Sequence, residues 1–304
     1  MRVLVLAEKH ETAKPFVNAM AAKGIKATYL QLVKISLISK HKNTLIKAMD
    51  EDIPQYDAVF LQARSNLAPF LEPLIEALND KKIYCNAKPG AFYLAVNEPY
   101  QFVNLAVNNV PIPKTLCSGS KKNIERVSKK ISYPLLAKSF KGKDVQQSTI
   151  VRSYSELNNF VNSIRTKIDG FMLREFIGAG VISCVVIGEK VFAIDRMIEG
   201  KGVNLERGKS CTLTDTQKEI VINAAKASKL DIAKIDIIKN QVISVETQIP
   251  LDIFNDVCSV KIENNIASFF EDKINEVGAK RQVGDDIKEL ATKLKKTIFG
   301  GLLK

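Results

Sequence analysis

Short aliphatic runs alternate with amphipathic stretches through residues 1–93, and this alternation constrains the fold more than any other feature. Arg2 to Ala7 is a continuous aliphatic run of the kind found in buried parallel strands. Strands separated by helices form βαβ units, so we expect a doubly wound α/β domain here. No GxGxxG occurs in it, which argues against a dinucleotide-binding site. The predicted strands are 2–7, 27–32, 56–62 and 82–86, with helices at 12–22 and 67–78.

Two later apolar runs, 235–238 and 245–250, each carry one acid. The turn-prone residues 239–241 lie between them, which predicts a β-hairpin with Asp236 and Glu246 on one face. Carboxylates among buried neighbours are costly unless they are paired or bound to a metal. Together with the amide oxygen of Gln248 they form a hard-oxygen set suited to Mg²⁺. The alternative is an exposed, acidic hairpin face that binds nothing.

The net charge of +12 is concentrated in one part of the chain. Residues 112–170 hold twelve Lys and Arg against four Asp and Glu. A local positive field favours an anionic ligand such as a nucleotide phosphate, a nucleic acid or an acidic polypeptide. The alternative is a solvated, lysine-rich surface.

Several classes of protein are disfavoured by composition. No apolar run approaches the roughly 20 residues needed to cross a bilayer, and the first residues predict a strand rather than a signal peptide. The five cysteines are scattered without CxxC spacing, so we expect neither disulfides nor a zinc knuckle, and a cytoplasmic location. Only His10 and His41 are present, and neither has the neighbours needed for a catalytic triad.

Pattern changes along the chain predict four parts, with boundaries at 1–93, 94–170, 171–278 and 279–304. The second part combines a connecting helix, a proline-fixed linker at 110–115 and a basic α/β module. The third is mainly antiparallel strands, including a hairpin across Gly188-Glu189, and a helix opened by the capping box of Thr214 and Gln217. The last is an amphipathic tail helix, which either docks on its own core or binds a partner or membrane surface.

Five stretches in this order resemble the ATP-grasp superfamily, in particular its RimK-type glutamate-ligase branch, over about residues 85–275. The resemblance implies an ATP-grasp fold of mixed α/β (α+β) class, with an N-terminal α/β domain, a small lid and a C-terminal antiparallel-sheet domain. The stretches, in chain order, are VPIPKT at 110–115, YPLLAK at 133–138, LREFI at 173–177, VNLERG at 203–208, and the set Asp236, Glu246 and Gln248.

The resemblance also implies roles for particular residues. Lys138, with Lys141 and Lys143 of the following loop, would contact ATP phosphates, and the backbone at Glu175, Phe176 and Ile177 would bind adenine. Asp236, Glu246 and Gln248 would hold Mg²⁺, while Arg196, Asn204 and Arg207 would face the γ-phosphate or the acceptor. Such a site transfers the γ-phosphoryl group to a carboxylate, giving an acylphosphate that an amine attacks.

This sequence departs from the family pattern in several places. The family lysine in the segment 97–100 is absent, with Pro99 or Tyr100 in its place. The loop 139–148 has one glycine where several would let backbone N–H groups close on phosphates. Val181 and Ser183 replace an acid and an arginine, Gly202 replaces an arginine, and Gln248 replaces the metal-binding asparagine. Each lost donor costs about 3 kcal/mol of transition-state stabilisation.

Three hypotheses follow. The first is an ATP- and Mg²⁺-dependent carboxylate–amine ligase that joins a small-molecule or peptide carboxylate to an amino-acid amine. The second is a degenerate ATP-grasp protein with weak or no nucleotide binding, acting as a scaffold or regulatory subunit. The third is a nucleic-acid-associated protein, which the lack of a stacking face on the basic module disfavours. A homo-oligomer is left open.

Overall fold

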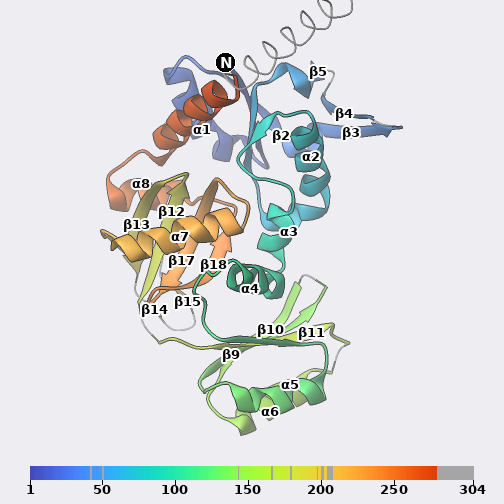
Figure 1. The fold of residues 1–304 in the computed structure, drawn as a ribbon, viewed down its shortest axis with the longest axis vertical. Coiled ribbons are helices and arrows are strands. Elements are labelled where there is room, and N and C mark those ends of the chain that lie inside the picture. The colour runs from blue at the N-terminus through green and yellow to red at the C-terminus, as the bar shows by residue number, and fades with distance from the viewer. Residues whose placement is uncertain are drawn as a thin grey trace, which may run out of the picture. The chain divides into compact units, whose positions relative to one another are not determined.

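The computed structural model describes residues 1–278 except 42, 50, 143, 166, 179, 197, 200, 201 and 204–207. The chain forms two compact units, each of which draws on separate parts of the sequence (Figure 1). Among the described residues, the first unit contains 1–61, 77–85 and 263–278, and the second contains 62–76 and 86–262.

The first unit is built on a four-stranded sheet of order β2-β1-β6-β7. The pairs β1/β2 and β6/β7 are parallel, as the alternating pattern predicted. Residues Val3 to Ala7 are fully buried, which explains their unbroken aliphatic run. The elements are β1 (Arg2–Ala7), α1 (His10–Ala22), β2 (Lys26–Gln31), β6 (Ala58–Gln62) and β7 (Tyr84–Cys85). Helix α2 (Ala68–Asp80) lies between β6 and β7 in the sequence, and its residues up to 76 belong to the second unit.

A second, antiparallel sheet lies between β2 and β6 in the sequence, where the sequence patterns predicted no element. It has the order β3-β4-β5 and buries Ile35, Ile46 and Ala48. Its strands are short and their outward positions are mostly polar, so periodicity alone gave little signal. The strands are β3 (Ile35–Lys40), β4 (Asn43–Ala48) and β5 (Glu51–Asp52).

The C-terminal part of the described chain, helical over 262–278, completes the first unit. Phe270 is fully buried and makes edge-to-face contacts with Phe60 and Tyr84, each at a centroid distance of 5.4 Å. The core of this unit therefore joins side chains from opposite ends of the described chain.

In the second unit, the helices α3 (Ala91–Val96) and α4 (Glu98–Val107) precede the basic module in the sequence. The carboxylate of Glu72 accepts hydrogen bonds from the N–H groups of Gly90, Phe92 and Tyr93, at 2.6, 2.5 and 3.2 Å. These are the N–H groups that a helix leaves unsatisfied at its start. Asn97 caps α4 by accepting from the N–H of Tyr100.

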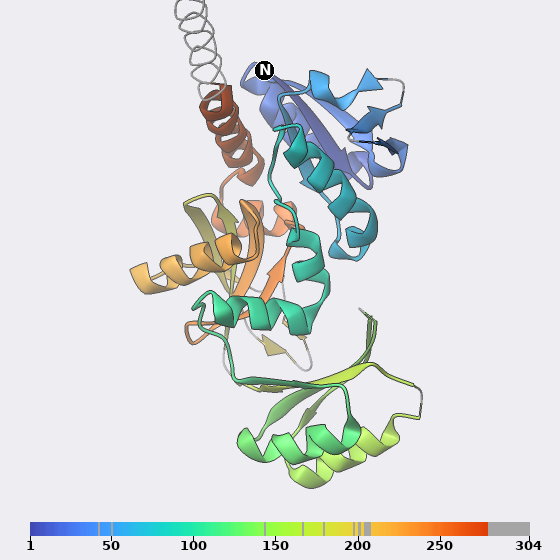
Figure 2. The ribbon, with the colours of Figure 1, turned by 45° about the vertical axis from the view of Figure 1, so that its right-hand side comes forward.

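The basic module is a sheet of order β10-β9-β11-β8, with α5 and α6 on one of its faces (Figures 1 and 2). We call this sheet with its two helices the lid. Its core contains Leu135, Ala137, Leu157 and Phe171. The elements are β8 (Thr115–Ser118), α5 (Lys121–Val127), β9 (Leu135–Lys141), β10 (Asp144–Val151), α6 (Tyr154–Ser163) and β11 (Gly170–Glu175).

The lid differs from the sequence prediction at two points. β11 pairs with β9 and β8, so the lid extends to Glu175 and the boundary predicted at 170 lies too early. Residues 139–148, predicted to be a polar loop, are mostly paired strand, because β9 continues to Lys141 and β10 begins at Asp144. The short hairpin turn contains Gly142 at a φ of 59°, a backbone conformation that glycine adopts readily.

A five-stranded sheet of the second unit has the order β16-β13-β12-β17-β18, and α7 covers one of its faces (Figure 1). β14 and β15 pair in a separate two-stranded sheet. Lys239 and Asn240 both have positive φ, the backbone of a two-residue type I′ hairpin turn. The capping box of Thr214 and Gln217 is present, as predicted. The elements are β12 (Val181–Ile187), β13 (Lys190–Arg196), β14 (Ile198–Glu199), β15 (Gly202–Val203), β16 (Lys209–Ser210), α7 (Asp215–Ala227), β17 (Ile232–Ile238), β18 (Gln241–Glu246) and α8 (Leu251–Cys258).

Two findings concern the predicted tail and membrane contact. The tail helix predicted at 279–304 lies outside the described residues. Among the helices that the structure describes, none has the length and hydropathy needed to span a membrane.

Candidate active site

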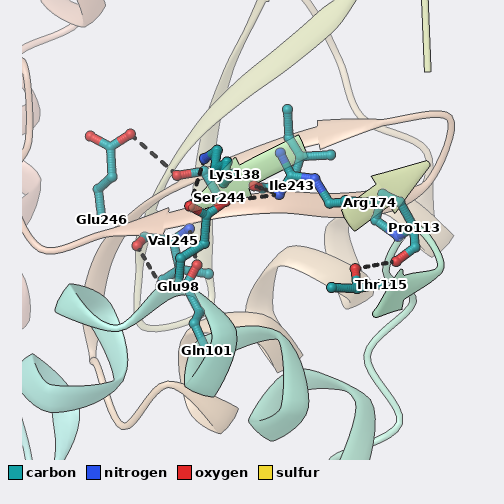
Figure 3. A network of polar contacts seen from close by, with 10 residues as sticks. All are labelled: Glu98, Gln101, Pro113, Thr115, Lys138, Arg174, Ile243, Ser244, Val245 and Glu246. Atoms are coloured by element: carbon teal, nitrogen blue, oxygen red, sulfur yellow. Dashed lines mark hydrogen bonds and ion pairs between the residues drawn. The ribbon is translucent and has the colours of Figure 1, made fainter. Parts of the chain in front are cut away.

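A cavity of about 360 Å³ lies within the second unit, lined by α4, the lid strands β9–β11 and β18. Its volume is in the range of small-molecule sites. Charged groups come from all three walls: Glu98 from α4, Lys138 and Arg174 from the lid, and Glu246 from β18. Figure 3 shows these side chains converging from their separate elements.

Glu98 holds both lid cations. Its Oε2 lies 2.6 Å from Lys138 Nζ, and its Oε1 lies 3.4 Å from Arg174 Nη1 (Figure 3). Arg174 also donates to the carbonyl of Ile243 at 3.0 Å and lies over the ring of Phe102. Burial lowers the pKa of Arg174, and the carboxylate of Glu98 acts in the opposite direction. Lys138 and Arg174, the two cations that line the cavity, therefore already have a counter-charge in Glu98.

Glu98 lies in the segment in which the family pattern places a lysine. The sequence predicts Pro99 or Tyr100 at that position, whereas the structure directs Glu98 into the cavity. The first turn of α4 thus presents an anion in place of the expected cation. Arg174, on the facing strand, supplies a positive charge in the same cavity.

α4 is fixed to β18 by one buried side chain. The amide of Gln101 donates to the carbonyl of Val245 at 2.9 Å and accepts from the Val245 N–H at 3.2 Å. β18 is the last strand of its sheet, so its outer backbone groups need partners from elsewhere. This pair of hydrogen bonds positions Glu98 opposite Glu246 across the cavity.

The predicted acidic pair shares one face of the hairpin, and a lysine lies between its members. Asp236 is opposite Ser244, and Lys234 is opposite Glu246, in the antiparallel register of β17 and β18. Lys234 Nζ lies 2.9 Å from Asp236 Oδ2 and 2.7 Å from Glu246 Oε1. Burial alone would lower the pKa of Lys234, but the two carboxylates outweigh burial and raise it. Lys234 is therefore a protonated ammonium at neutral pH.

The donor set does not fit a magnesium ion. Asp236 Oδ1 accepts from Ser183 Oγ at 2.6 Å, so both oxygens of this carboxylate are already bound to donors. Mg²⁺ needs oxygen lone pairs at 2.0–2.1 Å, directed at the ion. An ion bridging both carboxylates would also meet Lys234, at a repulsion of roughly 8 kcal/mol at 4 Å and an effective dielectric constant of 20. Among the residues described, no cluster of three His, Cys, Asp or Glu could hold a metal.

Gln248, the third predicted metal ligand, follows the end of β18 and is half-buried. Within the described chain no hydrogen bond joins it to Asp236 or Glu246. Its neighbour Thr247 is tied to the carbonyl of Ala63 at 2.8 Å. A shared contact, through Lys234, is therefore shown for Asp236 and Glu246 alone among the three predicted ligands.

Arg196 ends β13 and is 1% exposed. Its guanidinium lies over the ring of Phe254, 5.7 Å from the centroid, and none of its nitrogens has a hydrogen-bond partner among the described residues. Burial lowers the pKa of Arg196, while the charges of Asp236 and Glu246 act to raise it. A buried arginine with open donors suits an anion, since an unsatisfied buried donor is costly.

The predicted adenine hinge has part of its backbone already bonded. The N–H of Glu175 donates to the carbonyl of Lys114 at 3.0 Å, and the N–H of Phe176 donates to that of Pro134 at 2.9 Å. A base at this hinge would therefore use another backbone group, such as that of Ile177.

Lys141, also a predicted site residue, does not line this cavity. Lys141 is exposed, and strand alternation places it on the lid face opposite that of Lys138. Lys143, Asn204 and Arg207 lie outside the described residues.

Sequence reasoning missed Glu98, Arg174, Lys234 and Ser183 as site residues. Lys234 carried a usable signal, because it lies two residues before Asp236 and strand alternation puts both on one face. Arg174 carried no such signal, since its partners come from α4 and β18, which are distant in sequence.

Comparison with known proteins identifies this arrangement. The family model described as the RimK-like ATP-grasp domain matches residues 100–270, more than half of the chain. The chain belongs to the RimK-like ATP-grasp family. Its cavity, between the lid and β18, lies inside the matched region, apart from α3 and the start of α4.

Relatives in this family include ligases of known or assigned type. A probable alpha-L-glutamate ligase of Mannheimia succiniciproducens is 26% identical over 235 residues, which is 73% of this chain and 79% of the relative. The ATP-grasp ligase PsnB, solved with a minimal precursor, aligns with a TM-score of 0.67 at 14% identity, covering 88% of this chain and 97% of that one. Another PsnB structure contains Mg and ADP.

A RimK domain ATP-grasp protein from Sphaerobacter thermophilus aligns with a TM-score of 0.66 at 16% identity, over 88% of this chain and 99% of that one. At these identities the solved structures establish the fold. This RimK-like chain therefore has the ATP-grasp fold expected from its sequence.

Proposed function

We propose that this protein is an ATP-dependent carboxylate–amine ligase whose reaction takes place at the cavity between the lid and β18. The observation that carries the proposal is the convergence of Lys138 and Arg174 with Glu246 on one cavity of about 360 Å³. Membership of the RimK-like family supports the ligase class.

In the proposed reaction the terminal phosphoryl group of ATP is transferred to a substrate carboxylate. The product is an acylphosphate, and ADP leaves. The amine then attacks the acyl carbon, forms the amide bond and displaces inorganic phosphate. Such transfers need positioning and charge neutralisation more than covalent help from the protein.

We assign this work to two residues of the cavity and to other predicted site residues. Lys138 and Arg174 would turn from Glu98 to the ATP phosphates when nucleotide enters, because a polyphosphate offers more negative charge than one carboxylate. Arg196, with its open donors, would bind the transferred phosphoryl group or the acyl oxygen. The backbone near Ile177 would contact adenine. Asn204 and Arg207 are proposed to line the acceptor side.

The substrates proposed are a small-molecule or peptide carboxylate and an amino-acid amine. Glutamate is the first amine to test, because curated relatives are probable alpha-L-glutamate ligases. A peptide is the first acceptor to test, since the solved ligase PsnB binds a precursor. A cytoplasmic location and a homo-oligomer stay predictions.

Nucleotide binding is the first test. ATP at 100 times its dissociation constant should stabilise the protein by about 2.7 kcal/mol, a rise in Tm of several degrees. The variants Lys138→Ala and Arg196→Ala should reduce that rise. ADP formation that depends on both glutamate and a peptide carboxylate would then establish ligation. No thermal shift at millimolar ATP would contradict the proposal.

A second candidate is a RimK-like protein that has lost catalysis and acts as a scaffold or regulatory subunit. The specific observation in its favour is that Glu98 neutralises Lys138 and Arg174 from within. Binding of ATP without turnover of any carboxylate and amine pair, or no binding at all, would support this candidate.

A further inference from the structure

The ammonium of Lys234 lies in the place where the acidic pair would bind a cation. It is within 2.9 Å of Asp236 Oδ2 and 2.7 Å of Glu246 Oε1, so it bridges carboxylates from two adjacent strands. Its side chain is 8% exposed, against 49% for Glu246. In this cluster of Lys234, Asp236 and Glu246, the lysine therefore lies inside and Glu246 faces solvent.

This position is set by the backbone. Lys234 and Asp236 are two residues apart on β17 and therefore share a face, and Lys234 is directly opposite Glu246 in the register with β18. The lysine therefore cannot leave the face of the acidic pair without a shift of register. The contact is a consequence of strand geometry.

Hydrogen bonds occupy both oxygens of Asp236 and one oxygen of Glu246. Asp236 Oδ1 accepts from Ser183 Oγ, and Glu246 Oε1 lies 3.4 Å from Ser244 Oγ. Charged groups from the neighbouring strands are Arg196 from β13 and the pair itself. The two serines supply neutral donors, and Lys234 supplies the charge that a buried carboxylate requires.

We propose that Lys234 is a built-in cation that replaces a divalent metal at Asp236 and Glu246. The acidic pair is then a holder for the lysine, whose charge offsets one of the two carboxylates beside the cavity that Glu246 lines. A magnesium ion is excluded from this pair by occupation and by like-charge repulsion.

One consequence rests on the proposed function. When nucleotide binds, no metal held by Asp236 and Glu246 takes part, so ADP should bind about equally well with EDTA and with magnesium. The claim about the metal stands apart from nucleotide binding and can be tested without it.

Manganese binding to the whole protein tests the claim directly, because Mn²⁺ prefers the same hard oxygen ligands as Mg²⁺ and its free form is measured by electron paramagnetic resonance. We expect no loss of free Mn²⁺ signal with the wild type. Lys234→Met should bind Mn²⁺ at least about tenfold more tightly, a gain of ~1.4 kcal/mol. Adding Asp236→Asn should remove that gain.

Matched variants guard against misfolding and unspecific effects. Lys234→Gln keeps a donor and removes the charge, so it should gain Mn²⁺ binding if the methionine variant does not fold. Lys138→Met makes the same change beside a single carboxylate, Glu98, and should gain none.

The outcomes separate this inference from the ligase proposal. Mn²⁺ binding by the wild type that Asp236→Asn abolishes would overturn it, as would a folded Lys234 variant with no gain. If neither Lys234 variant folds, Mn²⁺ binding by the wild type is compared with Mn²⁺ binding by Asp236→Asn. Binding that only the wild type shows would again overturn the inference, and no binding by either protein would support it. Failure of ADP to bind, with the expected Mn²⁺ results, would overturn nucleotide binding and leave the built-in cation intact.

Discussion

At the scale of single residues, the cavity balances its charges from within. Glu98 neutralises the cations of the lid, and Lys234 neutralises the acids of the hairpin. Each contact lowers the cost of leaving a charge partly buried without a ligand. A bound ligand must compete with these contacts. A substitution that removes one of them should therefore lower the free energy of unfolding and raise the affinity for a ligand of the same charge.

Glu98→Gln is the clearest case. Removing the carboxylate leaves Lys138 and Arg174 without their counter-charge, so the free energy of unfolding should fall by about 1–2 kcal/mol, a value discounted for partial exposure. The same change frees both cations for phosphate, and ADP affinity should rise about tenfold. Thermal melts and calorimetric titration measure the two effects.

The exposed ion pair of Lys47 and Asp52, at 2.6 Å, provides the control. Asp52→Asn should change stability by no more than about 0.5 kcal/mol and leave ADP binding unchanged. An ADP affinity that falls in Glu98→Gln would show that Glu98 assists binding.

Cys117 reports on the same carboxylate. It is exposed on β8 and lines a second cavity, which also contains Glu98. Desolvation by the surrounding protein raises the pKa of the Cys117 thiol, and the charge of Glu98 raises it further. Glu98→Gln should therefore lower this pKa, increase the thiolate fraction at mildly alkaline pH and speed alkylation.

The pH dependence of iodoacetamide labelling measures this effect, with Cys117→Ser to identify the signal. Cys85 and Cys184 are buried and should label slowly in both proteins. An unchanged labelling profile in Glu98→Gln would mean that desolvation alone sets the pKa of Cys117.

At the scale of elements, the site depends on how α3, α4 and β13 are held. Glu72 of α2 anchors the start of α3 through three N–H groups. α4 begins two residues after α3 ends, so the position of Glu98 follows from this anchor. The carboxylate of Glu72 therefore helps to set the position of Glu98 in the cavity.

Glu72→Gln should destabilise the second unit by about 2 kcal/mol. The amide has one acceptor oxygen for three donors, and hydrogen bonds to a charged group are the stronger ones. Glu76→Gln, one turn along the same helix and exposed, is the matched control and should have little effect. Equal melting temperatures for the two variants would contradict the anchor.

Gly208 lies where β16 approaches β13. A Cβ at this position would be 2.2 Å from Ile194 Cγ2 and 3.2 Å from the carbonyl oxygen of Asp195. Gly208→Ala should cost about 1–3 kcal/mol through overpacking and displace the end of β13 that carries Arg196. Loss of ATP binding should accompany the loss of stability.

Gly278→Ala is the control for this substitution, because an added methyl group there meets no described atom within 4 Å. It should leave the melting temperature and ATP binding unchanged. A Gly208→Ala protein that melts and binds ATP like the wild type would contradict the close approach of β16 to β13.

At the scale of the whole molecule, the two ends of the described chain form one core. Phe270 is fully buried between Phe60 and Tyr84, whereas its neighbour Phe269 is half-buried. Phe270→Ala should cost about 3–5 kcal/mol by leaving a cavity, and Phe269→Ala clearly less. Chemical denaturation of both variants measures the difference, and equal losses would contradict this closure of the first unit.

The sequence by itself determined the larger elements and the family. Aliphatic runs, helix caps and the hairpin turn act locally, so the strands of the first sheet, the capping box at Thr214 and the hairpin carrying Asp236 and Glu246 were predictable. The VPIPKT and YPLLAK stretches in order indicated the ATP-grasp fold, which the comparisons confirm.

Only the tertiary structure decided which charged groups of the candidate site contact one another. Whether a carboxylate faces a metal or a lysine depends on strand register, and whether a lysine is free depends on which helix faces it. Lys234 between the acids and Glu98 against Lys138 and Arg174 are contacts of this kind. Side chains brought together from distant segments interact through short distances in a partly buried space, and residue order alone does not fix those distances.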